Sequence, residues 1–211
     1  MPWLRTGRNS DFFFIEEEDP LKIIDIIKEL CSRRLPKYYR VDPIRDIQVL
    51  CPMQRGETGA QNLNRVLQEV LNPTNISIKY GGIVFRLKDK VMQIKNNYDK
   101  NVFNGDIGTI VRIDMEDKTV TIRFDGVDVE YDVTELDEVV LAYSTTVHKS
   151  QGMTLDAAEI DLSEAFVEGM GYVALSRVKS LDNLYLKGIN KMAITVNDEA
   201  VAIDKMLKRL A

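Results

Sequence analysis

The sequence has few of the residues that mark several protein classes. It contains two cysteines and one histidine among 211 residues, too few for a Cys/His zinc site or a disulfide framework. No apolar run approaches the roughly 20 residues of a membrane span, and the N-terminus lacks the apolar core of a signal peptide. We therefore expect a cytoplasmic protein with reduced thiols, no metal site of its own and no contact with a membrane.

Motifs for nucleotide hydrolysis are also missing. The chain has no GxxxxGK[ST] loop, and Lys149-Ser150 stands before Gln151-Gly152, the wrong order for a loop that cradles phosphate. No acidic pair follows an apolar strand in the manner of a Mg²⁺-binding Asp-Glu. The chain by itself is therefore expected to be inactive as an ATP hydrolase.

The overall charge does not indicate a nucleic-acid partner, but its distribution is uneven. The net charge is −5, so any attraction to nucleic acid must come from a local patch. Residues 86–100 carry five basic side chains and two acids, whereas residues 114–138 carry ten acids and two basic side chains. This pattern fits either a solvated surface or a basic strand that follows a phosphate backbone. The basic residues considered for DNA contact are Arg86, Lys88, Lys90 and Lys95.

The two ends of the sequence alternate between strand and helix patterns. Residues 11–15 and 46–51 read as strands, the second apolar on both faces as in a central parallel strand. A helix is predicted from Pro20 to Pro36, with its apolar stripe beginning at Leu21, and another over residues 63–71. The pattern returns after residue 142, with strands at 157–162 and 184–186 and helices at 170–178 and 197–210.

The middle of the chain has a different pattern. Short strands at 91–94, 109–113, 119–124 and 127–131 are joined by tight turns, of which Asp125-Gly126 is a strong hairpin signal. We therefore expect a small β-barrel inserted into an α/β domain.

Three segments carry candidate functional residues. Thr145 to Gly152, TTVHKSQG, offers hydroxyls, an imidazole and a cation to a phosphodiester backbone, although a lone histidine is more often structural. Arg177, in GYVALSRV, suits an arginine finger or a partly buried ion pair. Gln54 and Arg55 follow the strand at 46–51, where ligands bind in open α/β sheets. A structural salt bridge explains Arg55 equally well.

Together these segments resemble a helicase family. TTVHKSQGMTLD resembles motif V of superfamily 1 helicases, and GYVALSRVKSLDNLYLKG resembles motif VI of the RecD-like branch, superfamily 1B. VLCPMQRGETG resembles motif IV, and FRLKDKVMQIKNNYDKNVFNGDIGTIV resembles an inserted SH3-like barrel. The front half is closest to stand-alone RecD-like proteins, whereas MTLDAAEIDLSEAF and VALSR are closer to the Pif-type subgroup.

The resemblance implies a fold and a domain division. It implies an α/β fold, a RecA-like parallel sheet with helices on both faces, interrupted by a small SH3-like β-barrel. Residues 1–80 and 143–211 would form the second RecA-like domain, and residues 81–142 the barrel. The first RecA-like domain, with motifs I to III, would belong to a longer parent protein.

The resemblance also implies roles for individual residues. Arg55 and Arg177 would act on the γ-phosphate of ATP, with Gln54, Gln151 and Gly152 at the nucleotide cleft. Four motif V residues would contact single-stranded DNA, namely Thr146, His148, Lys149 and Ser150. ATP with Mg²⁺ would bind only when the first domain is joined.

The implied parent protein is an ATP-dependent 5′–3′ DNA helicase, similar to the α-subunit of exodeoxyribonuclease V. Its partners would be single-stranded DNA, the missing first domain and, in a multi-subunit form, nuclease–helicase subunits. The alternative readings are a non-catalytic nucleic-acid-binding module built on the barrel, and a barrel that docks a partner protein.

Overall fold

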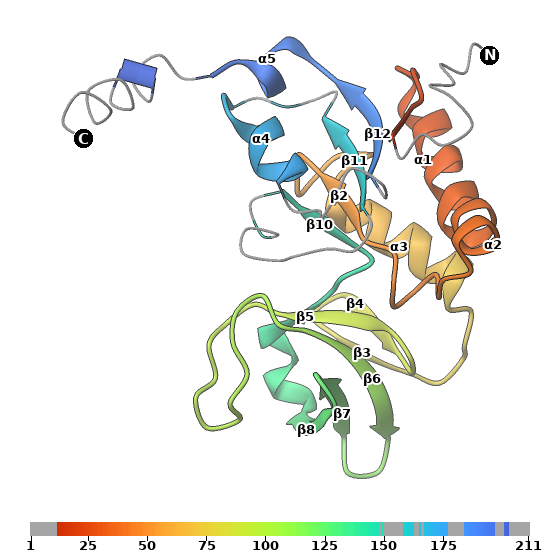
Figure 1. The fold of residues 1–211 in the computed structure, drawn as a ribbon. Coiled ribbons are helices and arrows are strands. Elements are labelled where there is room, and N and C mark those ends of the chain that lie inside the picture. The colour runs from red at the N-terminus through yellow and green to blue at the C-terminus, as the bar shows by residue number, and fades with distance from the viewer. Residues whose placement is uncertain are drawn as a thin grey trace.

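The computed structural model describes residues 12–147, 149, 158–162, 165, 167–176, 184–196 and 201–202. Figure 1 shows two parts, an α/β part made from both ends of the chain and a β part made from its middle. Within the described residues, no helix combines the length and the apolar character needed to cross a membrane.

The α/β part is built on a five-stranded sheet in which every neighbouring pair is parallel. Across the sheet, the strands are β1 (Phe12–Phe14), β12 (Leu184–Ile189), β11 (Ala158–Leu162), β2 (Val49–Cys51) and β10 (Ser144–Thr146). The strand expected at residues 46–51 is shorter than predicted, and it lies inside the sheet as its apolar sequence indicates.

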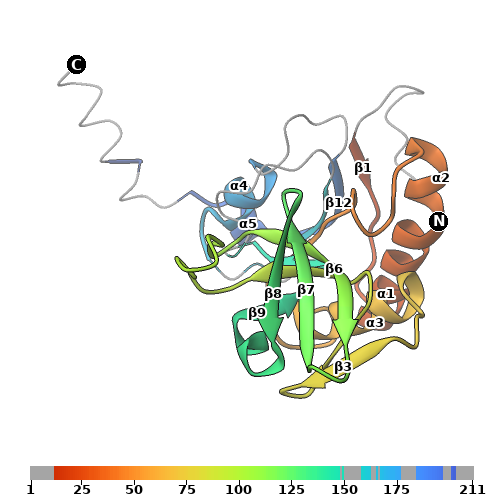
Figure 2. The ribbon, with the colours of Figure 1, turned by 90° about the horizontal axis from the view of Figure 1, so that it is seen from below.

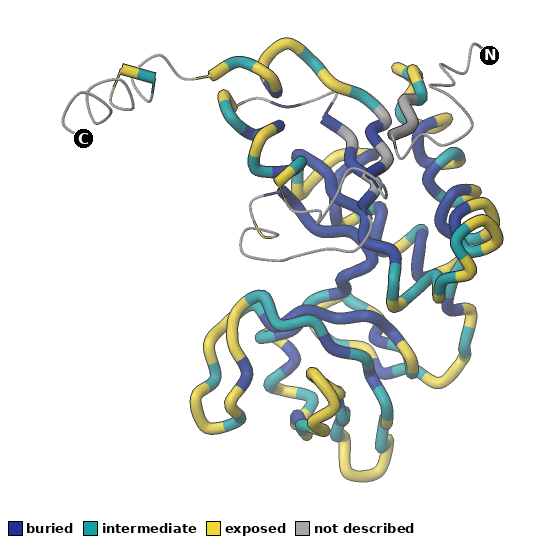
Figure 3. Tube along the Cα trace, viewed as in Figure 1, coloured by how far each residue is buried: buried dark blue, intermediate teal, exposed yellow. Residues whose placement is uncertain are grey.

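Helices cover both faces of this sheet, as expected. Val49 and Cys51 of β2 belong to the same buried cluster as the apolar residues of α1 (Pro20–Glu29) and α3 (Ala60–Leu71). Leu50 points the other way, into a second cluster with α4 (Met170–Leu175) and α5 (Lys191–Ile194). Figure 3 shows the buried strands between these two layers.

The first helix starts where predicted but does not end at Pro36. The Asp19 side chain accepts a hydrogen bond from the Leu21 N–H, and Pro20 occupies the first turn. Leu21 is 64% exposed, so the buried face begins at Ile23 instead.

The chain passes Pro36 through a π-helical turn. After α1 come a π-helical turn (Leu30–Arg34) and α2 (Leu35–Tyr39), and the Leu35 N–H donates to the Leu30 carbonyl five residues earlier. This wider turn places Pro36 at the start of a new helical segment, where it needs no N–H donor. The helix stops at Arg40, whose backbone is left-handed (φ 58°).

The β part is an antiparallel sheet with an added hairpin (Figure 2). The hairpin is β3 (Ser77–Tyr80) with β4 (Ile83–Arg86), and the sheet order is β8 (Val127–Asp132), β7 (Thr119–Phe124), β6 (Ile107–Asp114), β5 (Lys90–Gln93) and β9 (Val139–Leu141). A 3-10 helix, η2 (Val133–Glu138), joins β8 to β9.

The four strands predicted for this part are confirmed as β5 to β8. Asp125 (φ 43°) and Gly126 (φ 85°) form the expected two-residue turn between β7 and β8. The sequence did not indicate β3, β4 or β9, and β3 begins four residues before the predicted boundary at residue 81. The pairings give a five-stranded sheet with β8 and β9 at its edges, and closure into a barrel stays a prediction.

Candidate functional site

The loop after β2 presents Gln54 and Arg55 to solvent at the carboxyl end of the parallel sheet. The Ala60 N–H donates to the Met53 carbonyl (3.0 Å), which closes the loop at the start of α3. A Cβ atom at Gly59 would lie 2.4 Å from the Arg55 carbonyl oxygen, so only glycine permits this close approach. Among the described residues, the Arg55 guanidinium makes no hydrogen bond or ion pair, and the structural salt bridge is not seen there.

The candidate DNA-contacting segment leaves the sheet beside this loop. Thr146 ends β10 in register with Cys51 of β2, and the Val147 N–H donates to the Cys51 carbonyl (3.1 Å). Thr146 is buried, and its Oγ1 accepts a hydrogen bond from the Lys149 N–H (3.4 Å), while Lys149 itself is exposed. The Arg55 loop and the Lys149 segment therefore lie side by side, because they follow the carboxyl ends of adjacent parallel strands.

Asn64 of α3 fixes the point where the chain re-enters the sheet. Its Nδ2 donates to the carbonyl oxygens of Leu141 (3.0 Å) and Ser144 (2.9 Å), and its Oδ1 accepts the Ser144 N–H (2.7 Å). Asn64 is buried. One amide therefore holds the end of β9 and the beginning of β10 against α3.

A cavity of about 480 Å³ lies between the two parts. Its walls come from α3, the β3–β4 turn, β5, β9, β10 and the Arg55 loop. It brings together three of the residues predicted from the sequence, Gln54, Arg86 and Lys149. Apolar side chains such as Met92 and Leu141 contribute the rest of its surface. A cleft of this size with a few polar groups suits a small ligand or one unit of a polymer.

A buried carboxylate ties the β part to α3. Asp89 accepts hydrogen bonds from Gln68 Nε2 (2.6 Å), Asn72 Nδ2 (2.7 Å), the Tyr143 hydroxyl (2.7 Å) and the Arg86 N–H (2.6 Å). Burial raises the pKa of Asp89, although all four donors oppose that rise. Burial also raises the pKa of Tyr143, and the neighbouring Asp89 adds to the effect.

Lys90 is turned inward next to Asp89. Its Nζ donates to the carbonyl oxygens of Arg45 (3.3 Å) and Ile47 (3.0 Å), in the segment that leads into β2. Burial lowers the pKa of Lys90 to about 8, against a smaller opposing effect of Asp46. Lys90 is only 5% exposed, and its ammonium group is hydrogen-bonded to two backbone carbonyls, so in this structure it does not face a DNA strand as the sequence predicted.

The other basic residues of this stretch do not form a uniform row. Arg86 is half-buried and donates to the carbonyl oxygens of Gln68 and Asn72. Lys95 is exposed and paired with Asp137, which raises the pKa of Lys95. Lys88 is exposed, and its ammonium has no hydrogen bond or ion pair within the described part of the chain. Lys88 is thus the most available of the four predicted cations.

Five of the predicted residues lie outside the described residues, namely Arg177, His148, Ser150, Gln151 and Gly152. The helix α4 that precedes Arg177 is described and packs closely on α5, since a Cβ atom at Gly171 would lie 2.3 Å from the Ala193 carbonyl oxygen.

Three polar residues at the junction between α3 and the β part were not predicted from the sequence. Asn64 and Gln68 of α3 and its C-cap residue Asn72 are spaced by four residues, beside the apolar residues Leu63 and Leu67. Such a polar stripe on the flank of an apolar face is a sign of buried hydrogen bonds. This stripe was the feature of the sequence from which buried hydrogen bonds between α3 and the β part could have been predicted.

A family comparison matches the middle of the chain. Residues 63–124 match the family described as the ATP-dependent RecD-like DNA helicase SH3 domain. This range covers most of α3 and the strands β3 to β7. It therefore includes both sides of the junction around Asp89.

Curated relatives match a larger share of the chain. An ATP-dependent DNA helicase Pif1 of Psychrobacter sp. is 37% identical over 59% of this chain, and that match covers 20% of the relative. The ATP-dependent RecD2 DNA helicase of Deinococcus radiodurans is 34% identical over 63% of this chain and 19% of its own length. The chain thus spans about a fifth of the length of these two relatives.

Solved structures show the same fold. A Pif1 helicase from Bacteroides, crystallised with ADP-AlF3 and single-stranded DNA, aligns with a TM-score of 0.61 at 19% identity. The alignment covers 90% of this chain and 50% of that chain. A Pif1 helicase from Candida albicans aligns with a TM-score of 0.61 at 18% identity, covering 90% and 58%. The parallel α/β part accordingly has a RecA-like fold.

Proposed function

We propose that this chain, which is similar to RecD-like and Pif1 helicases, is part of the motor of an ATP-dependent DNA helicase. In this proposal the RecA-like sheet forms one wall of the ATP cleft, and a second RecA-like domain of the complete protein forms the other. The observation that carries the proposal is the arrangement at one sheet edge, where β2 leads into the Arg55 loop and β10 leads into the Lys149 segment.

On the nucleotide side, Arg55 is exposed at the carboxyl end of β2. We assign Arg55 and Arg177 to the γ-phosphate of ATP, where a guanidinium stabilises the charge that develops during phosphoryl transfer. Gln54, Gln151 and Gly152 complete this side of the cleft. The proposal places the Mg²⁺ ligands on the other domain, which would carry the GxxxxGK[ST] loop and the acidic pair that this sequence does not contain.

On the DNA side, we assign Thr146, His148, Lys149 and Ser150 to the backbone of a single strand. Lys149 lines the cavity between the two parts, and Lys88 offers a second exposed cation on the β part. Lysine ammonium and threonine hydroxyl groups are suited to phosphate oxygens and carry no sequence preference. The cavity thus offers a track along the junction, with its apolar lining available to bases.

Coupling between the two sides follows from the strand pairing. Thr146 and Cys51 are register partners, and the backbone bond from Val147 to Cys51 continues that pairing past the strand ends. A displacement of the Arg55 loop on hydrolysis would therefore be transmitted through two hydrogen-bonded backbones to the DNA segment. The 5′–3′ direction is part of the same proposal and rests on the resemblance to RecD-like proteins.

The test uses the complete protein that carries this chain. Arg55→Ala and Arg177→Ala should each lower DNA-stimulated ATP hydrolysis by about 10³-fold or more, while binding of single-stranded DNA stays close to that of the wild type. Arg112→Ala is the matched control, because Arg112 is an exposed arginine on β6 that pairs with Asp114. Wild-type turnover in Arg177→Ala would overturn the assignment.

A salt titration separates this motor from a simple binding module. Lys88→Ala should weaken binding to single-stranded DNA and reduce the salt dependence by about one phosphate contact. If the complete protein binds DNA with this salt dependence but never hydrolyses ATP, the binding module is the better description. Protein-partner docking would be favoured if no DNA binding is found at low salt.

A further inference from the structure

The loop between β5 and β6 carries two solvent-exposed aromatic rings. Tyr98 is 77% exposed and Phe103 is 40% exposed, and the ring centroids lie 6.0 Å apart in an edge-to-face arrangement. We propose that this pair is a stacking platform for bases of single-stranded DNA. The proposal extends the proposed function by naming a base contact on the β part, and it rests on that function.

The loop that carries the rings is held by backbone hydrogen bonds. Asn97 and Val102 form a reciprocal pair of backbone bonds (2.8 and 3.0 Å) across the loop. Asn101 adopts a left-handed conformation (φ 54°) between the two rings in sequence. Val102 is 1% exposed and anchors the loop in the core. The rings therefore project from a fixed base.

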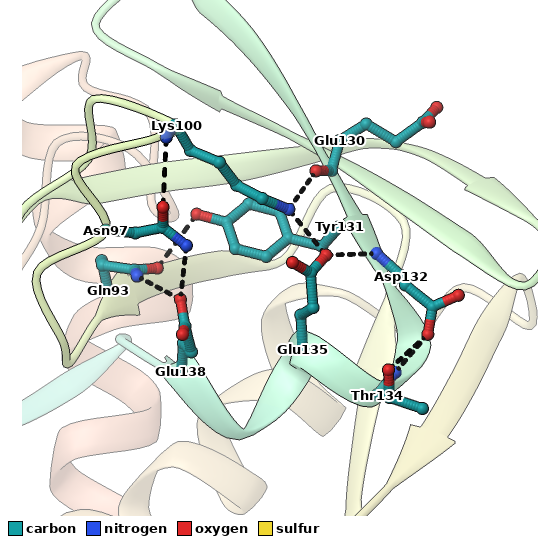
Figure 4. A network of polar contacts seen from close by, with 9 residues as sticks. All are labelled: Gln93, Asn97, Lys100, Glu130, Tyr131, Asp132, Thr134, Glu135 and Glu138. Atoms are coloured by element: carbon teal, nitrogen blue, oxygen red, sulfur yellow. Dashed lines mark hydrogen bonds and ion pairs between the residues drawn. The ribbon is translucent and has the colours of Figure 1, made fainter.

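A polar network fastens the same loop to β8 and η2 (Figure 4). Lys100 Nζ lies 4.3 Å from the centre of the Tyr131 ring and pairs with Glu135 (2.6 Å). The Tyr131 hydroxyl donates to Gln93 Oε1 (3.0 Å).

Glu138 completes the network. Its Oε2 accepts hydrogen bonds from Gln93 Nε2 (3.1 Å) and Asn97 Nδ2 (3.1 Å). Preorganisation of this kind lowers the entropy lost on binding, so the exposed rings can contribute more of their stacking energy.

Charge around the rings is compatible with a nucleic acid. Two acids of η2 near the loop pair with lysines, Glu135 with Lys100 and Asp137 with Lys95, and Glu138 accepts hydrogen bonds from the amides of Gln93 and Asn97. Residues 94–106 contain two lysines and two aspartates, so the loop carries no net negative charge. Aromatic faces bind bases of any sequence, which matches a motor that must step along arbitrary DNA.

The position of the loop also favours DNA. In Figures 1 and 2 the β5–β6 loop and α4 project to the same side of the molecule. The loop also departs from β5, whose Met92 lines the cavity that we assign to the DNA. Tyr38, an equally exposed tyrosine at 70%, sits on α2 at the opposite side.

The experiment measures equilibrium binding of fluorescent oligo(dT) to the complete protein without nucleotide. Tyr98→Ala and Phe103→Ala should each weaken binding by about fivefold or more, whereas Tyr98→Phe should keep wild-type affinity because the ring remains. Tyr38→Ala is the matched control and should bind as the wild type does. The salt dependence should not change, since no phosphate contact is removed.

An oligonucleotide of the same length with abasic sites identifies the contact. Wild type and Tyr98→Ala should bind this probe equally, because it offers no base to stack. Unchanged oligo(dT) affinity in both alanine variants, or an equal loss on the abasic probe, would overturn the platform. The proposed function would still hold after such a result if Arg177→Ala abolishes ATP hydrolysis. Failure of the stacking platform can therefore be distinguished from failure of the proposed function.

Discussion

Replacing Lys90 by methionine should change how the stability of the protein depends on pH. The Lys90 pKa is lowered by burial to about 8, from an ordinary value near 10.5. Between those two values the native chain loses the Lys90 proton while the unfolded chain keeps it. The unfolded state then binds more protons, and the free energy of unfolding rises with pH. A shift of this size corresponds to about 3 kcal/mol, since each pKa unit is worth about 1.4 kcal/mol.

The measurement is urea unfolding followed by circular dichroism at several values between pH 7.5 and 9.5. Other groups that titrate in this range act on both proteins, so the relevant quantity is the difference between Lys90→Met and the wild type. Across this interval, we expect Lys90 to add about 2 kcal/mol to the free energy of unfolding of the wild type. This increase should be absent from Lys90→Met. Above pH 10 the comparison ends, because burial also raises the pKa of Tyr131 and Tyr143 and stability then falls.

A second lysine provides the control. Lys95 is exposed, and its pKa is raised by Asp137 rather than lowered. Its contribution is therefore constant below pH 10, and Lys95→Met should keep the wild-type pH dependence. If Lys90→Met and the wild type differ by the same amount at every pH, Lys90 is not desolvated as the fold implies and the reasoning fails.

Three further changes test the junction and the loop. Asp89→Ala removes the acceptor of four hydrogen bonds and should lower the free energy of unfolding by at least about 3 kcal/mol. Asp99→Ala, at an exposed position, should change the free energy of unfolding little. Equal stabilities of the two variants would contradict the network. Asn64→Ala removes three hydrogen bonds at the start of β10 and should lower the free energy of unfolding by about 2 kcal/mol in the same urea assay. A smaller effect than that of Asn75→Ala, at an exposed position, would count against this role of Asn64. Gly59→Ala places a methyl group against the Arg55 carbonyl and should displace the Arg55 loop while the fold is retained. ATP hydrolysis by the complete protein should fall about 10²-fold, and full activity would show that Gly59 does not fix the loop.

Local sequence patterns were sufficient for most of the secondary structure. Pro20 with its Asp19 cap, the apolar run of β2 and the Asp125-Gly126 turn each depend on neighbouring residues, and all three are confirmed. Pro36 misled the prediction, because a proline ends a regular α-helix but is accepted after a π-helical turn. That turn depends on how the helix packs and has no signal in a local pattern.

The candidate site also contains residues that the sequence could predict and residues whose placement only packing decides. Position after a strand selected Arg55, and the chemistry of TTVHKSQG selected Thr146 and Lys149. The structure brings the two segments to one edge of the sheet. The charge pattern alone grouped Lys90 with Lys88, yet one ammonium is buried and the other exposed. Lys90 begins β5, and its ammonium group reaches the segment that leads into β2. Lys88 precedes that strand in a left-handed conformation (φ 73°).

The sequence by itself therefore determined many of the strands and helices, the two-part division and the helicase resemblance, because each depends on local apolar spacing or on short motifs. Tertiary structure alone decided which polar groups are buried. Asp89 meets Gln68, Asn72 and Tyr143 only after α3, β4 and the start of β10 have packed together. The burial of a charge depends on partners up to 54 residues away, and no local pattern records contacts of that range.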